Sequence, residues 1–186
     1  MRITGGRVKG KLLAPFKGLK IRPTSDHVRE AIFNILGQGL VGETVLDLFA
    51  GTGALGLEAI SRGAVRAVFV DRSPKAIAII RKNVEICGFG ELVQILKRDL
   101  LRGLPTLETL GGRPFTMVFI DPPYRKGFIP KIISELISKH VLAPGAVVII
   151  ESAKSEMIHD VAGLYRSDSR VYGDTKIDFF VFGVRS

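Results

Sequence analysis

The chain has 186 residues, of which 46% are hydrophobic and 24% charged, as expected for one soluble globular domain with a buried core. No apolar run reaches the roughly 18 to 20 residues of a membrane span, and the first residues lack an apolar signal region. A single cysteine, Cys87, excludes an internal disulfide, and the three histidines have no metal-ligand spacing. We therefore expect a cytoplasmic protein that uses no metal and binds no membrane.

The net charge of +9 is concentrated at the N-terminus. Residues 1–29 hold eight basic side chains and one acidic one, Asp26, so seven of the nine net charges lie there. A basic segment on a nearly neutral body is typical of a nucleic-acid binder. A solvated tail is the alternative, but the apolar residues in this segment favour short strands with glycine turns. The basic side chains are Arg2, Arg7, Lys9, Lys11, Lys17, Lys20, Arg22 and Arg29.

The remaining sequence alternates between helical and strand patterns. Apolar residues at helical spacing predict a first helix that ends at Gly37. Short apolar runs then alternate with amphipathic segments, and the last two runs face each other across Gly173-Asp174, which is typical of a hairpin. Strands are expected at 44–49, 67–70, 92–96, 115–120, 146–150, 165–172 and 177–184, and further helices from about 54 to 62, from 74, around 129–136 and at 155–162.

This alternation predicts an α/β fold built on a mostly parallel, doubly wound sheet with a C-terminal antiparallel hairpin. No linker divides the α/β body. We expect a small basic N-terminal extension, residues 1–38, that binds RNA, followed by the body at residues 39–186.

Four of the predicted strands end at or near an aspartate: Asp47, Asp71, Asp99 and Asp121. Ligands of doubly wound sheets bind at the carboxyl ends of the strands. One such acid is commonly only a helix cap, but four in succession indicate a pocket suited to a cationic ligand.

The first strand leads into a glycine turn that reads Gly51-Thr52-Gly53-Ala54-Leu55-Gly56, with Asp71 twenty residues after Gly51. This matches the dinucleotide-binding fingerprint, in which the backbone approaches the ligand at the glycines and a carboxylate holds ribose hydroxyls. An acid at Asp47 would repel a pyrophosphate but suits the amino group and sulfonium of S-adenosylmethionine. The turn therefore favours that donor over a dinucleotide.

Asp121-Pro122-Pro123-Tyr124 follows the fourth strand. Consecutive prolines form a rigid, non-helical turn with free carbonyls. Asp121 and the Pro122 carbonyl are suited to accept both hydrogens of an exocyclic amine, while Tyr124 stacks on its ring. The segment predicts transfer of a methyl group to an amine.

Together these residues resemble the class I S-adenosylmethionine-dependent amino-methyltransferases, and within them the RsmD family. The likeness runs from Arg2 to about Glu151 and includes the segments 2–6, 10–11, 22–36 and 47–59. Two departures stand out. His27 replaces a residue that is usually basic, and Thr52 stands where serine is common.

The resemblance implies a Rossmann-like class I fold with seven strands and an enzyme that methylates N2 of one guanine in bacterial 16S ribosomal RNA. The cofactor would be S-adenosylmethionine, with S-adenosylhomocysteine as product, and the partner an assembled or assembling small ribosomal subunit bound by a monomer. Asp71 would hold the ribose hydroxyls and Asp99 would receive the adenine amino group. The expected cofactor-binding residues are Asp47, Phe49, Ala50, Gly51, Gly53, Asp71, Arg72, Asp99 and Leu100; the catalytic ones are Asp121, Pro122, Pro123 and Tyr124; the RNA-binding ones are Lys9, Lys11, Lys17, Lys20, Arg22, Thr24 and Arg29.

Four alternatives remain open. A DNA adenine-N6 methyltransferase normally carries a target-recognition region, for which 186 residues leave no room. A protein glutamine-N5 methyltransferase usually has asparagine at the position of Asp121 and needs no basic extension. A dinucleotide-dependent oxidoreductase is disfavoured by Asp47 and by the proline turn. A non-catalytic RNA-binding assembly factor would have kept the fold and lost the chemistry.

Overall fold

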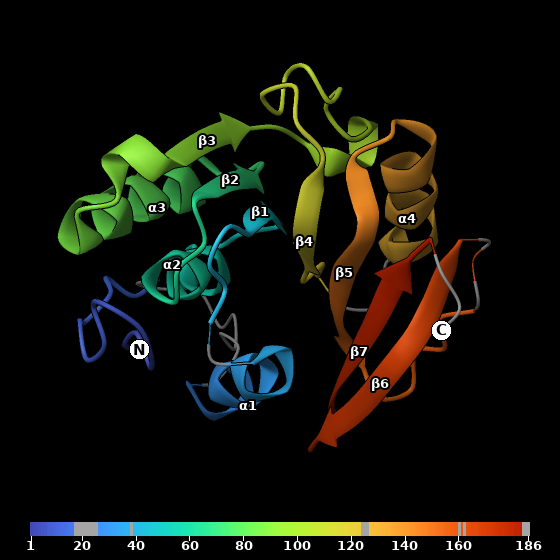
Figure 1. Ribbon diagram of the computed structural model, residues 1–186, viewed down its shortest axis with the longest axis horizontal. Helices are drawn as coiled ribbons and strands as arrows, with labels where there is room; N and C mark the ends of the chain where they lie inside the picture. The colour runs from blue at the N-terminus through green and yellow to red at the C-terminus, as the bar shows by residue number, and fades with distance from the viewer. Residues whose placement is uncertain (17–25, 38, 124–126, 160, 162, 184–186) are drawn as a thin grey trace. The chain divides into compact units, whose positions relative to one another are not determined.

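The computed structural model describes residues 1–16, 26–37, 39–123, 127–159, 161 and 163–183 (Figure 1). The chain forms two compact units, Met1–Lys97 and Arg98–Ser186, hereafter the first and second units. The described residues before residue 38 belong to the first unit, and the boundary between the two units follows Lys97. A separate RNA-binding role for residues 1–38 stays a prediction.

The first unit is built on three parallel strands in the order β3-β2-β1. The central residues of β1 and β2 are buried and, apart from Asp47, apolar, as in parallel sheets. α1, α2 and α3 gather on one side of the strands (Figure 1). The elements are α1 (Asp26–Leu36), β1 (Thr44–Leu48), α2 (Ala54–Ser61), β2 (Arg66–Asp71), α3 (Pro74–Cys87) and β3 (Val93–Lys97), with a 3₁₀ turn at Gly90–Leu92.

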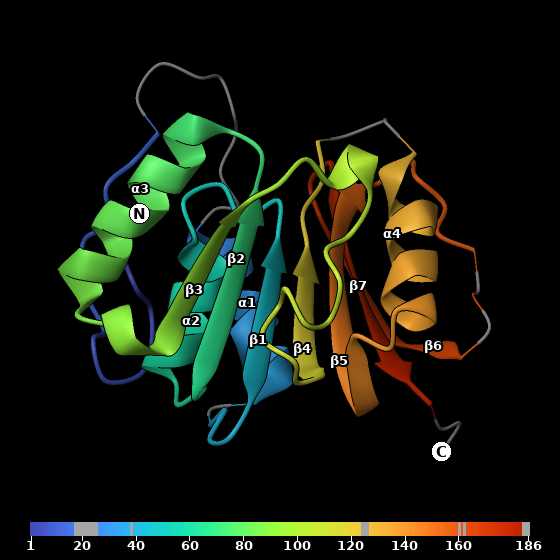
Figure 2. The same ribbon diagram turned by 90° about the horizontal axis from the view of Figure 1, so that it is seen from above.

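The second unit has four strands in the order β4-β5-β7-β6. β4 and β5 run parallel, whereas β7 is antiparallel to both β5 and β6. Figure 2 shows α4 beside β5. The elements are β4 (Phe115–Ile120), α4 (Phe128–Ser138), β5 (Leu142–Ala153), β6 (Leu164–Tyr172) and β7 (Thr175–Phe182), with a 3₁₀ turn at Leu100–Arg102.

The predicted α/β fold, with parallel strands and a closing antiparallel hairpin, is confirmed, and the described residues contain the seven expected strands. The helix expected at 155–162 is wrong for the described residues of that range. There the carbonyl of Glu156 accepts from Lys176 Nζ and that of Ile158 from Arg166 Nη2, so side chains occupy carbonyls that a helix would use. Met157 is exposed whereas Ile158 is buried, so the apolar residues of this segment do not form the buried stripe of an amphipathic helix.

Residues 1–16, which we call the arm, pack on the first unit instead of forming a solvated tail. Ile3 and Leu13 are buried, and the backbone N–H of Ile3 donates to the carbonyl of Lys11. Arg7 N–H donates to the carbonyl of Ser61, at the end of α2. Gly6 has a φ of 74°, and a Cβ there would lie 1.9 Å from that same Ser61 carbonyl oxygen. The arm approaches α2 so closely that only glycine fits at this point.

Among the helices that the structure describes, none is both long and apolar enough to cross a membrane.

Candidate active site

The glycine turn, residues 49–53, connects β1 to α2 with an unusual backbone. Gly51 and Gly53 have φ values of 57° and 76°, and Phe49, which is not a glycine, has a φ of 60°. Such a conformation at a residue with a side chain costs about 1–3 kcal/mol and persists only where the surroundings enforce it. Two backbone hydrogen bonds do so, from Ala50 N–H to the carbonyl of Val70 and from Gly53 N–H to that of Ala50. The predicted residues Phe49, Ala50, Gly51 and Gly53 thus lie in one constrained turn.

Asp71, at the end of β2, is fixed beside this turn. Its Oδ2 accepts the N–H of Gly51 at 3.0 Å, and its Oδ1 accepts the N–H of Ser73 at 2.8 Å. Each carboxylate oxygen keeps a further lone pair, and the residue is partly exposed. The geometry presents a carboxylate, oriented by backbone donors, that can accept hydrogen bonds from two neighbouring hydroxyls.

Asp47, on β1, is buried below the turn. Its Oδ2 accepts the N–H of Gly56 at 3.0 Å. Burial raises the pKa of Asp47 to about 8; the Gly56 hydrogen bond opposes the rise, and the negative charge of Asp71 adds to it. The carboxyl is therefore largely protonated at pH 7. That Asp47 contacts the methyl donor stays a prediction.

Gly56, the last glycine of the G-x-G-x-x-G pattern, is required for steric reasons. A Cβ at this position would lie 2.4 Å from Cε1 of Phe69 on β2. The third glycine of the pattern thus allows α2 to approach the sheet and its N–H to reach Asp47.

The side chain of Asn83 was missed by the sequence analysis. It is completely buried on α3. Its Nδ2 donates to the carbonyl of Thr52 at 2.9 Å and to that of Ala14 at 3.3 Å, while its Oδ1 accepts the N–H of Ala14 at 2.7 Å. One carboxamide therefore contacts both the glycine turn and the arm. The only signal in the sequence is an asparagine within the buried stripe of a helix.

Two further predicted sites belong to the second unit. Asp99 caps the 3₁₀ turn by accepting the N–H of Leu101 at 3.1 Å, and Leu100 is buried. Asp121 directly follows β4 and is half-buried, Pro122 is buried and Pro123 is exposed. Tyr124 lies outside the described residues. The cap explains Asp99 structurally, and its contact with a cofactor stays a prediction.

The predicted RNA-binding residues fall into three groups. Lys9 and Lys11 are exposed on the arm, as a phosphate contact requires. Arg72, which is predicted to bind the cofactor and not RNA, is exposed as well. Arg29 is completely buried, so the prediction that it holds a phosphate disagrees with this structure. Its guanidinium is already paired with carboxylates, those of Asp26 and Glu58. Lys17, Lys20, Arg22 and Thr24 lie outside the described residues.

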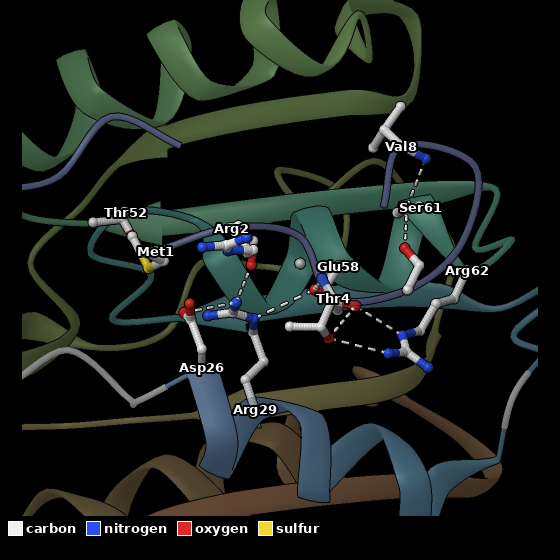
Figure 3. Close-up of polar contacts among 12 residues, drawn as sticks. Met1, Arg2, Thr4, Val8, Asp26, Arg29, Thr52, Glu58, Ser61 and Arg62 are labelled. Atoms are coloured by element: carbon white, nitrogen blue, oxygen red, sulfur yellow. Dashed lines mark hydrogen bonds and ion pairs between the residues drawn. The ribbon is translucent and has the colours of Figure 1, made fainter. Parts of the chain in front are cut away.

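Glu58, on α2, is the centre of this buried network (Figure 3). It accepts from Arg29 Nε at 3.4 Å, from Arg62 Nε at 2.9 Å and from both the N–H and the hydroxyl of Thr4 at 2.8 Å. Arg29 Nη2 also donates to the carbonyl of Arg2. The network joins α1, α2 and the arm, so the buried side chain of Arg29 serves packing.

The described residues hold no group of three or more His, Cys, Asp or Glu able to bind a metal ion.

Comparison with known proteins shows the family. The chain belongs to the family described as "Conserved hypothetical protein 95", whose model matches residues 1–181, and this is the RsmD family predicted from the sequence. Ribosomal RNA small subunit methyltransferase D of Escherichia coli (strain K12) is 35% identical over 152 residues, which cover 82% of this chain and 74% of that protein. The protein of the same name from Buchnera aphidicola (subspecies Acyrthosiphon pisum) is 32% identical over 157 residues, covering 84% and 80%.

Solved structures confirm the Rossmann-like class I methyltransferase fold. The solved structure titled "Putative methyltransferase yhhF from Escherichia coli" is 31% identical in sequence and has a TM-score of 0.84. The match covers 100% of this chain and 99% of that chain. An RNA methyltransferase from Salinibacter ruber in complex with S-adenosyl-L-homocysteine covers 88% and 95%, with a TM-score of 0.67; at 17% identity it supports the fold alone.

Proposed function

From membership of this family and the geometry of the glycine turn, we propose that the chain is an S-adenosylmethionine-dependent ribosomal RNA methyltransferase acting on the exocyclic N2 amine of a guanine in the small subunit. The observation that carries the proposal is the Asp71 carboxylate, held by the Gly51 and Ser73 N–H groups beside the turn. The two relatives from Escherichia coli and Buchnera aphidicola are named as small-subunit ribosomal RNA methyltransferases, which supports the substrate class.

The donor site of the first unit is suited to a nucleoside without phosphates. Asp71 accepts the ribose hydroxyls, and the turn backbone approaches the rest of the molecule. The acid at Asp47, neutral at pH 7, and the negative charge of Asp71 supply no attraction for a pyrophosphate. Asp99 and Leu100 are proposed to contact the adenine, and Arg72 to lie beside the ribose. S-adenosylhomocysteine is the product.

The acceptor site is proposed at Asp121, Pro122, Pro123 and Tyr124. The carboxylate and the Pro122 carbonyl accept the amine hydrogens and orient the nitrogen toward the methyl group. S-adenosylmethionine would supply the methyl group: the nitrogen lone pair would form the new N–C bond as the C–S bond breaks, its electrons would remain on a neutral thioether, and the amine would release one proton to solvent. The protein contributes position and electrostatic stabilisation and needs no covalent intermediate.

RNA is proposed to bind the exposed lysines of the arm, Lys9 and Lys11, together with Lys17, Lys20, Arg22 and Thr24. Positive side chains that neutralise phosphates release counterions and supply affinity without sequence specificity. The RNA is proposed to be part of an assembled or assembling small subunit in the bacterial cytoplasm, bound by a monomer.

The experiment is transfer of a labelled methyl group from S-adenosylmethionine to small-subunit RNA, free and as assembled particles, followed by nucleoside analysis. Label in N2-methylguanosine supports the proposal. Label in N6-methyladenosine, or in a glutamine of a ribosomal protein, would identify one of the alternative methyltransferases. Binding of RNA without transfer would identify an assembly factor. The Asp121→Ala variant is the control for contaminating activity.

A further inference from the structure

We propose that Asn83 is a positioning residue that couples the arm to the methyl-donor turn, so that a docked arm is part of what makes the donor site competent. This inference rests on the proposed donor site. It makes two segments that are predicted to do different tasks, RNA binding and donor binding, dependent on one buried carboxamide.

One peptide group of the glycine turn has its carbonyl hydrogen-bonded to the side chain of Asn83. In the peptide that joins Thr52 to Gly53, the N–H of Gly53 donates to the carbonyl of Ala50 within the turn. The Thr52 carbonyl accepts from Asn83 Nδ2, which reaches it from α3 at 2.9 Å. Because the Gly51 N–H is bonded to Asp71, the direction of the turn peptides also sets how that carboxylate is presented.

The arm depends on the same side chain. Both backbone groups of Ala14 are bonded to Asn83, one to its oxygen at 2.7 Å and one to its nitrogen at 3.3 Å. The amide oxygen of Asn83 thereby fixes the direction in which its nitrogen points, toward Thr52. A second contact between the turn and the arm is made by the Thr52 hydroxyl and the Met1 sulfur, 3.8 Å apart (Figure 3).

The consequence follows from burial. With the arm docked, Asn83 is completely shielded from solvent, so its three hydrogen bonds are made without competition from water. When the arm leaves, the carboxamide loses two of its three hydrogen bonds and no longer has a fixed orientation. The Thr52 carbonyl then loses a preorganised donor, and the turn gains conformations that bind the donor less well. By linkage, a ligand that tightens the turn must also favour the docked arm by the same factor.

The first test is the binding of S-adenosylhomocysteine measured by calorimetry. Asn83→Ala should raise the Kd about three- to tenfold, as expected when one buried hydrogen bond is removed. Lys82→Ala, which alters the exposed neighbouring position on α3, should leave the Kd unchanged. Equal affinity of the folded Asn83→Ala variant and the parent chain would overturn the proposal.

The second test changes the arm and leaves α3 intact. Ala14→Pro removes the N–H that Asn83 accepts, and Ala14 already precedes a proline, which favours a compatible extended backbone. It should raise the Kd about two- to fivefold, whereas Ala14→Ser, which keeps the N–H, should not. In the Asn83→Ala background Ala14→Pro should add little, because the coupling runs through that side chain. Additive effects would contradict the coupling.

The third test reads the reverse direction. Saturating S-adenosylhomocysteine should slow hydrogen exchange at the Leu13 and Ala14 amides in the parent chain and not in Asn83→Ala. A residue that only supports the fold would not give this ligand dependence. If the parent chain binds the ligand and shows the coupling but methylates no RNA, the proposed function fails and this inference stands. If it does not bind the ligand, both fail.

Discussion

Arg29 Nε and Glu58 Oε2 lie 3.4 Å apart, and both side chains are completely shielded from solvent. Glu58 Oε1 also forms an ion pair with Arg62 Nε at 2.9 Å, so one buried carboxylate compensates two guanidinium groups. Asp26 is a further ion-pair partner of Arg29. An arrangement of this kind contributes little net stability compared with an apolar core, but removal of one member leaves charges buried without compensation.

Glu58→Gln should therefore destabilise the protein by about 3–5 kcal/mol, because Arg29 and Arg62 would keep their charges in a site that excludes water. The free energy of unfolding in urea measures the effect. Glu30→Gln, on the exposed side of α1, is the matched control and should change stability by less than about 0.5 kcal/mol. Similar unfolding curves for the two variants would refute the structural role of the network.

The raised pKa of Asp47 predicts a pH-dependent stability. Since the pKa of this acid in the folded state, about 8, lies above its unfolded value, the folded state holds the proton more tightly. The stabilisation is fully present below about pH 4 and is lost as the pH rises through about 8. Asp47→Asn removes the titration and should flatten the decline between pH 6 and 8, as measured by urea unfolding. Asp174→Asn, at an exposed site, should leave the slope as in the parent chain.

Asp71→Ala should weaken S-adenosylmethionine binding by about 1–3 kcal/mol, because it removes charge-assisted hydrogen bonds to the ribose. The variant also frees the N–H groups of Gly51 and Ser73. Asp71→Asn, which keeps one acceptor, should have a smaller effect. Calorimetry with the donor and with NAD measures both, and Glu85→Ala on the surface of α3 is the control. Tighter binding of NAD than of the donor would contradict the methyltransferase proposal.

Asp121→Ala should reduce turnover roughly a hundredfold or more while donor affinity changes little, since the proposed partner of Asp121 is the target amine. The measurement is single-turnover methyl transfer to small-subunit RNA beside a donor titration of the same preparation. Collapse of donor binding with turnover preserved would assign Asp121 to the donor site instead.

Lys9→Ala combined with Lys11→Ala should lower the salt dependence of RNA affinity by about 0.7 to 0.9 in logarithmic slope for each phosphate that is no longer neutralised. Both lysines are exposed on the arm. Arg113→Ala combined with Lys154→Ala removes the same charge from exposed positions outside it and should leave the slope nearly unchanged. If the two double variants lower the slope equally, the net charge of the protein and not the arm is responsible for RNA binding.

The fold was predictable because its signals are local. Apolar runs, the glycines of the turn and the Gly173-Asp174 hairpin each specify structure within a few residues, and the structure has strands and turns at those places. The position of Asp71 beside the glycine turn was also predictable. The twenty residues from Gly51 to Asp71 span one helix and the next strand, which brings the end of that strand next to the turn.

The errors concern partners that are distant in the sequence. Arg29 is predicted to hold a phosphate because it belongs to the basic segment and lies on a helix, but no local pattern indicates that it pairs with Glu58, twenty-nine residues later. An asparagine in the buried stripe of a helix did not identify the partner of Asn83, because Ala14 lies sixty-nine residues away. The helix expected at 155–162 is wrong for another reason, since side chains of the following strands β6 and β7 bind the carbonyls of Ile158 and Glu156.

The attachment of the arm to α2 and α3 also sets an order of events during synthesis. The arm leaves the ribosome before its partners Glu58, Ser61 and Asn83, which are 53 to 69 residues farther along the chain. Until α3 has emerged, the arm cannot dock fully, and contacts of such sequence separation form late because a long loop must close first. A nascent chain of this protein therefore exposes its basic arm during most of the synthesis of the first unit.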